Sequence, residues 1–393
     1  MINLSLEIGH FPDMWKGALV KPELKKSGLE PEKKNYRPVS NLQFLSKLTE
    51  KAVIQQTVSH IMSCGLFPEM QSAYRQFHST ETALLRVRND ILLNMNSQHV
   101  TLLVFLDLSA AFDTIDHTVL LKRLEDKFGF SGTALEWFRS YLSDRFQQVV
   151  IDGVRSDKFD IDFGVPQGSC LGPLLFSIYM SQLSDIVSKH LPTVHCYADD
   201  TQLYLFFRPN DSTTQDAAVT AMEACIRDIR KWMIKDKLKI NDDKTQFILI
   251  GTRAQLQKVT IDRLVVGDSV VPSSCEAIKN LGAWFDSHFT MNTHILKICK
   301  AGFYYLHNIS RIRKFLSRET TETLIHAFVT SCLDYCNSLL YGLPNSLVYK
   351  LQRLQNSAAR LIFRAPRYCH ITPLLTELHW LNIKHRIDRK SVV

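Results

Sequence analysis

The clearest hydrophobic run in the chain covers residues 100–106, and it ends in an acid, Asp107. A run of this length that is apolar almost throughout predicts a strand buried on both faces. Residues 118–143 read as helix, whereas residues 146–163 alternate between polar and apolar positions in the manner of strands. The first 98 residues mix short helical and loop signals with clusters of lysines.

Two further segments combine turn residues with strong apolar patterns. In the segment 163–187, Gly164, Pro166 and Gly168 interrupt regular structure, and Pro173 suits the first turn of the helix that follows. In the segment 193–207, two β-rich arms flank an Ala-Asp-Asp triplet. This second pattern predicts a hairpin that carries acids at its turn.

The rest of the chain completes an α+β pattern. Polar residues 208–216 predict a loop, a helix follows near 217–238, and a strand ends at Gly251. From about residue 290 the pattern is wholly helical. The order of strand, helix, two strands, helix and strand predicts a small antiparallel sheet with helices against it.

Composition sets outer limits on the class of protein. The chain has 393 residues, of which 45% are hydrophobic, which is enough for two or three domains. We find no secretory signal pattern and no apolar stretch near the roughly 18 residues that cross a bilayer, so we expect a soluble, intracellular protein without a membrane partner. Nine scattered cysteines favour a reducing compartment. A zinc site made of Cys332, Cys336, Cys369 and His370 stays an alternative, although its spacing fits no standard finger.

The charge is distributed unevenly around a net value of +8. Residues 291–393 contain 15 Lys and Arg against 5 Asp and Glu, and residues 1–100 contain 12 against 9. The middle of the chain is therefore acidic. A basic end attached to an acidic centre suggests phosphate binding beside a cation site.

Residues 346–364 read as one amphipathic helix with a basic stripe. At about 100° per residue, Lys350 and three arginines lie on one side of this helix. Leu347, Leu351, Leu354, Ala358, Leu361 and Ile362 form a single apolar face on the other side. We expect the helix to dock by its leucines and to present four cations outward, with a merely solvated face as the alternative.

Three acids carry the candidate chemistry. Asp107 ends the buried strand, and Asp199 and Asp200 lie at the tip of the hairpin, so an antiparallel sheet can make them neighbours. Magnesium prefers carboxylate oxygens, and two such ions can activate a 3′-hydroxyl and stabilise a leaving pyrophosphate. Taken alone, Asp-Asp at a turn is also ordinary turn chemistry. Asp113 and Asp116 are expected to be solvated or to cap a helix.

The ordered segments resemble a known family. FLDLSAAFDTIDH, GVPQGSCLGPLLFSIYM and YADD, at 105–117, 164–180 and 197–200, resemble successive core motifs of reverse transcriptases. LKINDDKTQFILIG and NLGAWFD follow in the family's order, and NYRPVSNLQFLSKLTEK and QSAYRQFHSTETAL precede them. LDYCNSLLYG and LQRLQNSAARLI are similar to the region after the palm in LINE-type, or non-LTR, retrotransposons.

The resemblance implies a right-hand polymerase. It would have fingers at 1–98, a palm at 99–288 with a fingers-contributing insertion at about 118–163, and a helical thumb and truncated C-terminal region at 289–393. Its activity would be RNA-directed DNA synthesis by two-metal nucleotidyl transfer onto a primer 3′-hydroxyl. It would use two Mg²⁺ ions, or Mn²⁺ in their place, an RNA template, a DNA primer or target DNA, and dNTPs. The family is expected in the cytoplasm and nucleus.

The same resemblance assigns roles to individual residues. The metals would be held by Asp107, Asp199, Asp200 and the carbonyl of Leu108. The incoming nucleotide would meet Arg37, Gln167, Lys244 and the sugar-selecting ring of Phe112, which is otherwise a core aromatic. The template and primer would meet Gly168, within a loop that packs the nascent base pair, together with Lys47, Arg75, Lys350, Arg353, Arg360 and Arg364.

Two departures from the family pattern leave alternatives open. Gln76 and Phe77 stand where relatives show Pro-Gly or a similar turn, which could disturb a template-gripping loop. The chain is also shorter than family proteins, lacks a nuclease constellation and reads as a piece of an element. A catalytically silent nucleic-acid-binding relic is therefore one alternative, and a group II intron-type maturase or a telomerase polymerase is another.

Overall fold

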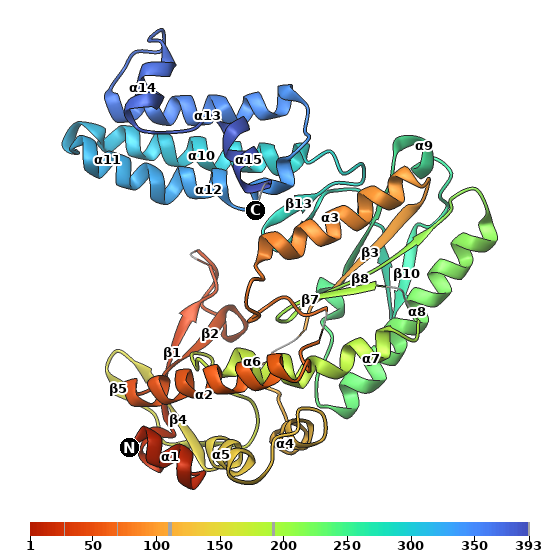
Figure 1. Cartoon of the computed structure of the whole chain (residues 1–393), viewed down its shortest axis with the longest axis vertical. Coiled ribbons are helices and arrows are strands. Elements are labelled where there is room, and N and C mark those ends of the chain that lie inside the picture. Colours follow the sequence, from red (N-terminus) through yellow and green to blue (C-terminus); the bar gives the residue numbers. More distant parts are fainter. Residues whose placement is uncertain (27, 69, 109–111, 191–192, 392–393) are drawn as a thin grey trace.

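The computed structural model describes residues 1–26, 28–68, 70–108, 112–190 and 193–391 (Figure 1). Its chain forms three parts: an N-terminal part around a five-stranded sheet, a central part around a four-stranded sheet, and a C-terminal helical bundle. This is the α+β class that the order of patterns predicts. No helix among the described residues is both long enough and apolar enough to cross a membrane.

The central sheet is antiparallel and has the order β7-β8-β3-β9. Its strands are β3 (Val100–Leu106), β7 (Thr193–Tyr197), β8 (Asp200–Phe207) and β9 (Gln246–Ile250). The middle strand β3 is the apolar run at 100–106, and six of its seven residues are buried. The predicted doubly buried strand and the hairpin at 193–207 are therefore both confirmed.

Helices cover both faces of this sheet, which explains the uninterrupted apolar run. On one face, Leu103 packs with residues of α3 (Thr80–Asn96). On the other face, Leu102 and Val104 share a core with helices α4 (His117–Asp126), α6 (Gly172–Tyr179) and α8 (Ser212–Lys235). Successive side chains of a strand point to opposite faces, so each residue of β3 meets an apolar layer.

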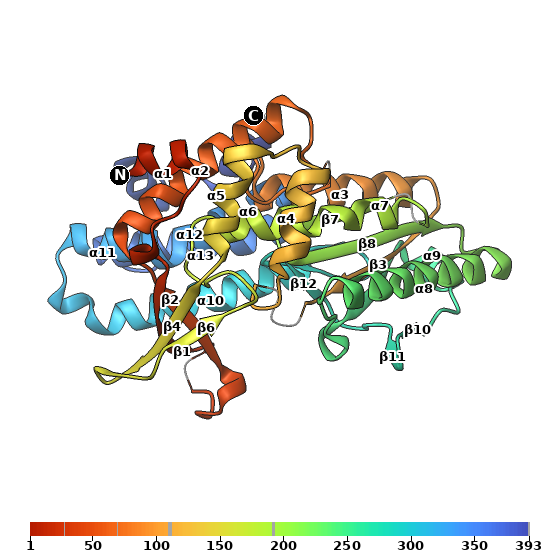
Figure 2. The ribbon, with the colours of Figure 1, turned by 90° about the horizontal axis from the view of Figure 1, so that it is seen from below.

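The N-terminal sheet joins the start of the chain to a distant segment. Its strands are β1 (Gly17–Leu24), β2 (Tyr36–Asn41), β4 (Arg145–Ile151), β5 (Val154–Arg155) and β6 (Phe159–Ile161). Strand β1 pairs antiparallel with β2 and parallel with β4. Figure 2 shows these strands together as a ribbon beside α1 (Ile2–Ile8), α2 (Phe44–Ser63) and α5 (Gly132–Leu142).

The C-terminal bundle has its own hydrophobic core. Its helices are α10 (Asn292–Ile312), α11 (Arg318–Ile325), α12 (Ser331–Asp334), α13 (Asn345–Phe363), α14 (Ile371–Glu377) and α15 (Ile383–Ser391). The helix expected at 346–364 is α13, which buries Leu351, Leu354, Ala358 and Ile362. Docking by the apolar face is thus confirmed.

Several boundaries differ from the sequence interpretation. The helix expected over 118–143 is two helices, α4 (His117–Asp126) and α5, because the link between them has positive φ at Gly129 and Gly132. The loop expected at 208–216 ends early, since the Asp211 carboxylate caps α8 (Ser212–Lys235). Helices α6 (Gly172–Tyr179), α7 (Leu183–Val187) and α9 (Arg253–Leu256), and the hairpins β10 (Arg263–Val266)–β11 (Ser269–Pro272) and β12 (Ile278–Asn280)–β13 (Ala283–Phe285), complete the fold.

Candidate active site

The central sheet brings the three candidate acids together at one edge. Strands β3 and β8 pair with Leu106 opposite Thr201, so Asp107 and Asp200 continue the same register just beyond the pairing. Asp199 lies in the tight turn between β7 and β8, in which Ala198 has a φ of 57°. Residues far apart in sequence are therefore neighbours at the strand ends, as the sequence predicts.

These acids interact electrostatically. Loss of hydration, followed by the negative charges of Asp199 and Asp107, raises the pKa of Asp200 to about 6. The Lys244 ammonium donates to the Asp107 carboxylate at 3.1 Å. Lys244 ends the short 3-10 turn Asp242–Lys244 just before β9, and β9 pairs with β3 as far as Gln246 opposite Phe105, so Lys244 lies close to the end of β3.

The donor chemistry of this edge fits a hard divalent cation. Carboxylate oxygens are the preferred ligands of Mg²⁺, and mutual repulsion among three acids is relieved by a cation, a role that Lys244 fills in part. In the described part of the chain, however, no three His, Cys, Asp or Glu side chains converge closely enough to form a metal site. Leu108 bridges to Ile240 of the neighbouring segment.

The glycine-containing loop at 164–171 packs tightly against Asp113 and strand β2. Gly164 has a φ of 79°, and an added Cβ would lie 2.8 Å from the backbone of Asp113. Gly168 has a φ of 141°, and an added Cβ would lie 2.2 Å from the carbonyl oxygen of Ser40. Only glycine can fill these positions, because the backbone of the loop lies directly against Asp113 and Ser40, and the approach of Gly168 to a base pair stays a prediction.

Gln167 of this loop is held from two sides. Its Nε2 donates to both carboxylate oxygens of Asp113, at 3.0 and 2.9 Å. Its carbonyl oxygen accepts from the Ser40 amide of β2 at 2.7 Å. The sequence suggested that Asp113 is solvated or caps a helix. Instead, its carboxylate binds the Gln167 amide and orients that side chain.

The side chain of Phe112 packs against the core and is partly exposed. Its ring centroid lies 5.1 Å from that of Phe176 in α6. Its side chain is half-buried at the margin of the main core. The three residues before it, 109–111, lie outside the described residues, and the sugar-selecting role stays a prediction.

A buried acid that the sequence interpretation missed organises the loop. Glu50 of α2 is fully buried, and its Oε2 accepts from the Ser169 hydroxyl at 3.0 Å and from the amides of Cys170 and Leu171 at 2.6 and 3.3 Å. Its Oε1 accepts from the Tyr141 hydroxyl at 3.1 Å. Burial and then the charge of Glu50 raise the pKa of Tyr141 well above its usual range.

The Glu50 contacts join three segments that are distant in sequence. The carboxylate lies just before the N-terminus of α6, where backbone amides lack helical partners and the helix dipole favours an anion. It thus ties α2 and α5 to the loop that carries Gln167. In the sequence, Glu50 stands out only as an acid among the apolar positions of the helix at 44–63. That position does not indicate which groups the carboxylate would bind.

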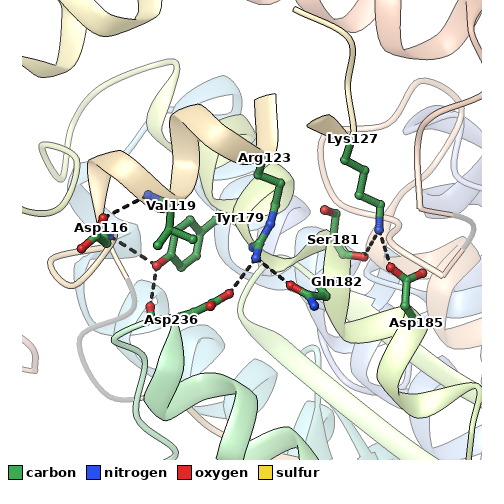
Figure 3. A network of polar contacts seen from close by, with 9 residues as sticks. All are labelled: Asp116, Val119, Arg123, Lys127, Tyr179, Ser181, Gln182, Asp185 and Asp236. Carbon is green, nitrogen blue, oxygen red and sulfur yellow. Dashed lines mark hydrogen bonds and ion pairs between the residues drawn. The ribbon is translucent and has the colours of Figure 1, made fainter. Parts of the chain in front are cut away.

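A second polar network fastens α4 to the central part (Figure 3). Arg123 pairs with Asp236 at 2.6 Å, and both side chains are buried. Arg123 also donates to Gln182 at 3.0 Å, and the Tyr179 hydroxyl donates to the carbonyl oxygen of Asp236. The Asp116 carboxylate accepts from the Val119 amide at 3.0 Å and so caps α4, as expected from the sequence.

The other predicted nucleotide and template residues are spread over the N-terminal part. Arg37 is exposed on β2, and Lys47 is half-buried on α2. The Arg75 guanidinium lies over the Phe67 ring at 5.5 Å. In the same loop Phe77 has a φ of 61° and is 89% exposed, a conformation that suits glycine better.

The predicted cations of α13 separate into two places. Lys350 donates to the side chain of Asn292 at 3.3 Å, whereas Arg353, Arg360 and Arg364 line one cavity with Arg313. Among the described residues, none of the proposed zinc cysteines forms a disulfide. In the same part of the chain, which includes Cys332, Cys336 and Cys369, no three His, Cys, Asp or Glu side chains lie close enough to hold a metal ion, so the zinc alternative is not supported.

Comparison with known proteins places this site in context. Residues 24–285 match the family model described as reverse transcriptase (RNA-dependent DNA polymerase). The chain is 27% identical over 400 residues to a probable RNA-directed DNA polymerase from transposon BS of Drosophila melanogaster, covering 99% of this chain and 43% of the relative. It is 28% identical over 386 residues to the polymerase from mobile element jockey of the same fly, covering 94% of this chain and 40% of the relative.

Among solved structures, apo telomerase from Candida tropicalis aligns with a TM-score of 0.48 and 13% identity, covering 95% of this chain and 66% of that one. Of the two transposon relatives named above, the chain spans about two-fifths of the length. The family match covers every candidate acid, the Glu50-bound loop and Lys244. The chain belongs to the reverse transcriptase (RNA-dependent DNA polymerase) family, and its relatives are enzymes of non-LTR retrotransposons.

Proposed function

We propose that this chain is the RNA-directed DNA polymerase part of a LINE-type retrotransposon protein and that it adds deoxynucleotides to a primer 3′-hydroxyl. The observation that carries the proposal is the juxtaposition of Asp107 with the Asp199–Asp200 turn at one edge of an antiparallel sheet. The family match supports the same reaction class.

The three parts of the fold support an assignment to a right-hand polymerase. Residues 99–288 would be the palm, since they contain the central sheet and its acids. Residues 1–98 would be the fingers, joined by the insertion at about 118–163, because β1 pairs with β4. Helix α3, at the end of the first range, packs on the central sheet. Residues 289–393 would be the thumb.

The carboxylates of Asp107, Asp199 and Asp200, with the carbonyl of Leu108, would hold two Mg²⁺ ions, or Mn²⁺ in their place. When bound, such ions lower the pKa of the attacking hydroxyl and neutralise charge on the leaving pyrophosphate. Lys244 contacts Asp107 from the other side of the site. This position suits a lysine that gives a proton to pyrophosphate, and its ammonium also steadies Asp107.

The chain's own residues would position the nucleotide. Gln167, oriented by Asp113, would contact the template base or the dNTP, and Gly168 would let the backbone approach the base pair. Phe112 would lie under the sugar and clash with a 2′-hydroxyl. Arg37 would bind the triphosphate through its planar guanidinium, and Lys47 and Arg75 would bind triphosphate or template phosphates.

The nucleic-acid partners would be an RNA template and a DNA primer or target DNA. Lys350 of α13, beside Asn292, and the arginines that line a cavity with Arg313 would contact these nucleic acids. Contacts of this kind go to phosphates, so they would fix position without reading sequence.

Primer extension tests the proposal directly. The purified chain, given Mg²⁺ and dNTPs, should extend a DNA primer on an RNA template. Asp199→Ala should abolish extension while heteroduplex binding stays near wild type, because the lost carboxylate acts in the transition state. Asp262→Ala, which removes an exposed acid beside β10, is the matched control and should extend normally. Extension by Asp199→Ala at the wild-type rate would refute the site, and a wild type that binds heteroduplex without extending it would favour the catalytically silent alternative.

A further inference from the structure

The C-terminal bundle contains a concave basic surface formed largely by the arginines of α13. A cavity of about 800 Å³ lies between α10 and α13, and we call it the bundle groove. Its lining includes five arginines, namely Arg313, Arg353, Arg360, Arg364 and Arg367, and no acid. Two aromatic side chains, Phe303 and Tyr349, also line this groove.

The arginines of the bundle groove have no carboxylate to neutralise them. Among the side chains that the structure describes, none of the five forms an ion pair with Asp or Glu. Arg313 donates three hydrogen bonds to the carbonyl oxygens of Leu316, Leu361 and Ile362, at 2.8, 3.0 and 2.6 Å. Carbonyl oxygens fix a guanidinium in place without cancelling its charge, so the wall of the groove stays cationic.

Most of the donor capacity in the groove is unused. Arg364 donates once, to the carbonyl oxygen of Arg313 at 3.1 Å, and Arg360 donates once, to that of Cys369 at 3.2 Å. Within the described chain, the side chains of Arg353 and Arg367 make no hydrogen bond. A guanidinium has five N–H donors, so these four side chains could still bind several phosphate oxygens. A helix that only needed capping at its C-terminus would not require Arg353, which lies ten residues before that end.

The aromatic side chains distinguish the kind of nucleic acid. Phe303 is 42% exposed and Tyr349 is 63% exposed, so both rings are accessible in the groove. Unpaired bases stack on such rings, whereas the bases of a duplex are already stacked on one another. Ser310, Asn356 and Ser357 also line the groove and offer hydroxyl and amide groups that can bond a ribose 2′-hydroxyl.

The position of the groove separates it from the candidate active site. Its lining runs along α10 from Phe303 to the end of that helix and along α13 from Tyr349 past Arg364, and Figure 1 shows both helices in the bundle, away from β3 and β8. A strand bound there is therefore not part of the base pair at the acids. We propose that the bundle groove binds a single-stranded segment of RNA outside the primer–template duplex. This inference rests on the proposed function, which makes RNA a partner of the chain.

The test is equilibrium binding of a labelled, unstructured RNA of about ten nucleotides, measured by fluorescence anisotropy at several salt concentrations. Arg353→Gln with Arg367→Gln removes two cations that support no other described contact. Affinity should fall, and the slope of log affinity against log salt should shrink by about 1.4, from about 0.7 for each lost contact with a single strand. Lys300→Gln with Arg311→Gln removes the same charge from α10 outside the groove and should leave the slope closer to wild type.

A separate variant tests whether RNA bases stack on the aromatic rings of the groove. Tyr349→Ala leaves the charge unchanged and should weaken RNA binding about fivefold or more, with an unchanged salt slope. Wild-type affinity in both the arginine and the tyrosine variants would overturn the proposal. Single-stranded DNA bound as tightly as RNA would overturn the assignment to RNA, and an equal loss of heteroduplex affinity in both variants would assign the groove to the duplex instead. Binding is measured without dNTPs, and the same variants are assayed for single-nucleotide addition, so loss of RNA binding and loss of polymerisation are observed separately.

Discussion

The buried carboxylate of Glu50 offers the sharpest test of how the fold positions the nucleotide. It joins α2 to the loop at 164–171 through Ser169, Cys170 and Leu171. That loop carries Gln167, so Glu50 is a positioning residue that would never touch substrate itself. We predict that Glu50→Gln weakens nucleotide binding with little change in turnover.

The expected magnitudes follow from the contacts. Hydrogen bonds to a charged acceptor contribute about 1.5–3 kcal/mol each and neutral ones about 0.5–1.5. In Glu50→Gln the amide oxygen can still accept at the Oε2 position, and the amide nitrogen can donate to the hydroxyls of Tyr141 and Ser46, which lie 3.1 and 3.4 Å from Oε1. The loss of charge should therefore cost about 1–3 kcal/mol of stability. Glu50→Ala leaves several buried donors without a partner and should cost about 3–5 kcal/mol.

The assay is single-nucleotide addition at varied dNTP concentration, beside urea unfolding. A loop that contacts the nucleotide equally before and during reaction contributes uniform binding, so loosening it raises KM more than it lowers kcat. We expect KM for dNTP to rise about tenfold in Glu50→Gln, which corresponds to about 1.4 kcal/mol. Turnover should change much less.

A matched control separates positioning from general destabilisation. Ile61→Val truncates a buried side chain on the same helix, away from the loop, and should cost about 0.5–1.5 kcal/mol. Its KM should stay at the wild-type value. If Glu50→Gln loses stability while KM stays unchanged, or if Ile61→Val raises KM equally, Glu50 serves only the stability of the fold.

Two further predictions concern sugar choice and acid stability. Phe112→Val should raise the incorporation of ribonucleotides relative to deoxyribonucleotides, because it removes a clash, and an unchanged ratio in an active variant would leave Phe112 as a core residue packed on Phe176. Burial lowers the pKa of His294 to about 4, so the folded chain keeps this ring neutral where the unfolded chain, with a pKa near 6.5, already binds a proton. The free energy of unfolding should therefore fall as the pH falls from about 6.5 toward 4, by up to about 1.4 kcal/mol per pH unit from this group. Urea unfolding at pH 7, 6 and 5 should show a shallower dependence in His294→Leu, and an identical dependence would show that the ring is protonated in the folded chain or titrates alike in both states.

Local sequence patterns were sufficient to predict an element wherever a residue and its neighbours in sequence share one environment. The run at 100–106 reads as a doubly buried strand because every position except Thr101 is apolar, and the leucines of α13 read as a docking face because their spacing matches a helix. Gly164 and Gly168 likewise mark a backbone that bends tightly. The family resemblance of the ordered motifs also needs only sequence, and it named the three acids.

Pairings between distant segments were beyond local patterns. The two sides of the β1–β4 pair are separated by more than a hundred residues, and the first strand has no clear alternation, so the joining of 17–20 to 146–149 appears only in the fold. The capped start of α8 and the break between α4 and α5 were misread because one acid or two glycines outweighed a longer periodic signal.

Residue type and order were enough to identify the family and the class of fold, and they named the residues that are proposed to carry the chemistry. Tertiary structure alone decided which groups meet: Glu50 with the loop before α6, Lys244 with Asp107, and Arg313 with the arginines of α13. The free energy of burying a charged side chain depends on the partner that it meets in the folded chain. That partner can lie anywhere in the sequence, so the role of such a side chain cannot be predicted from its position in the sequence.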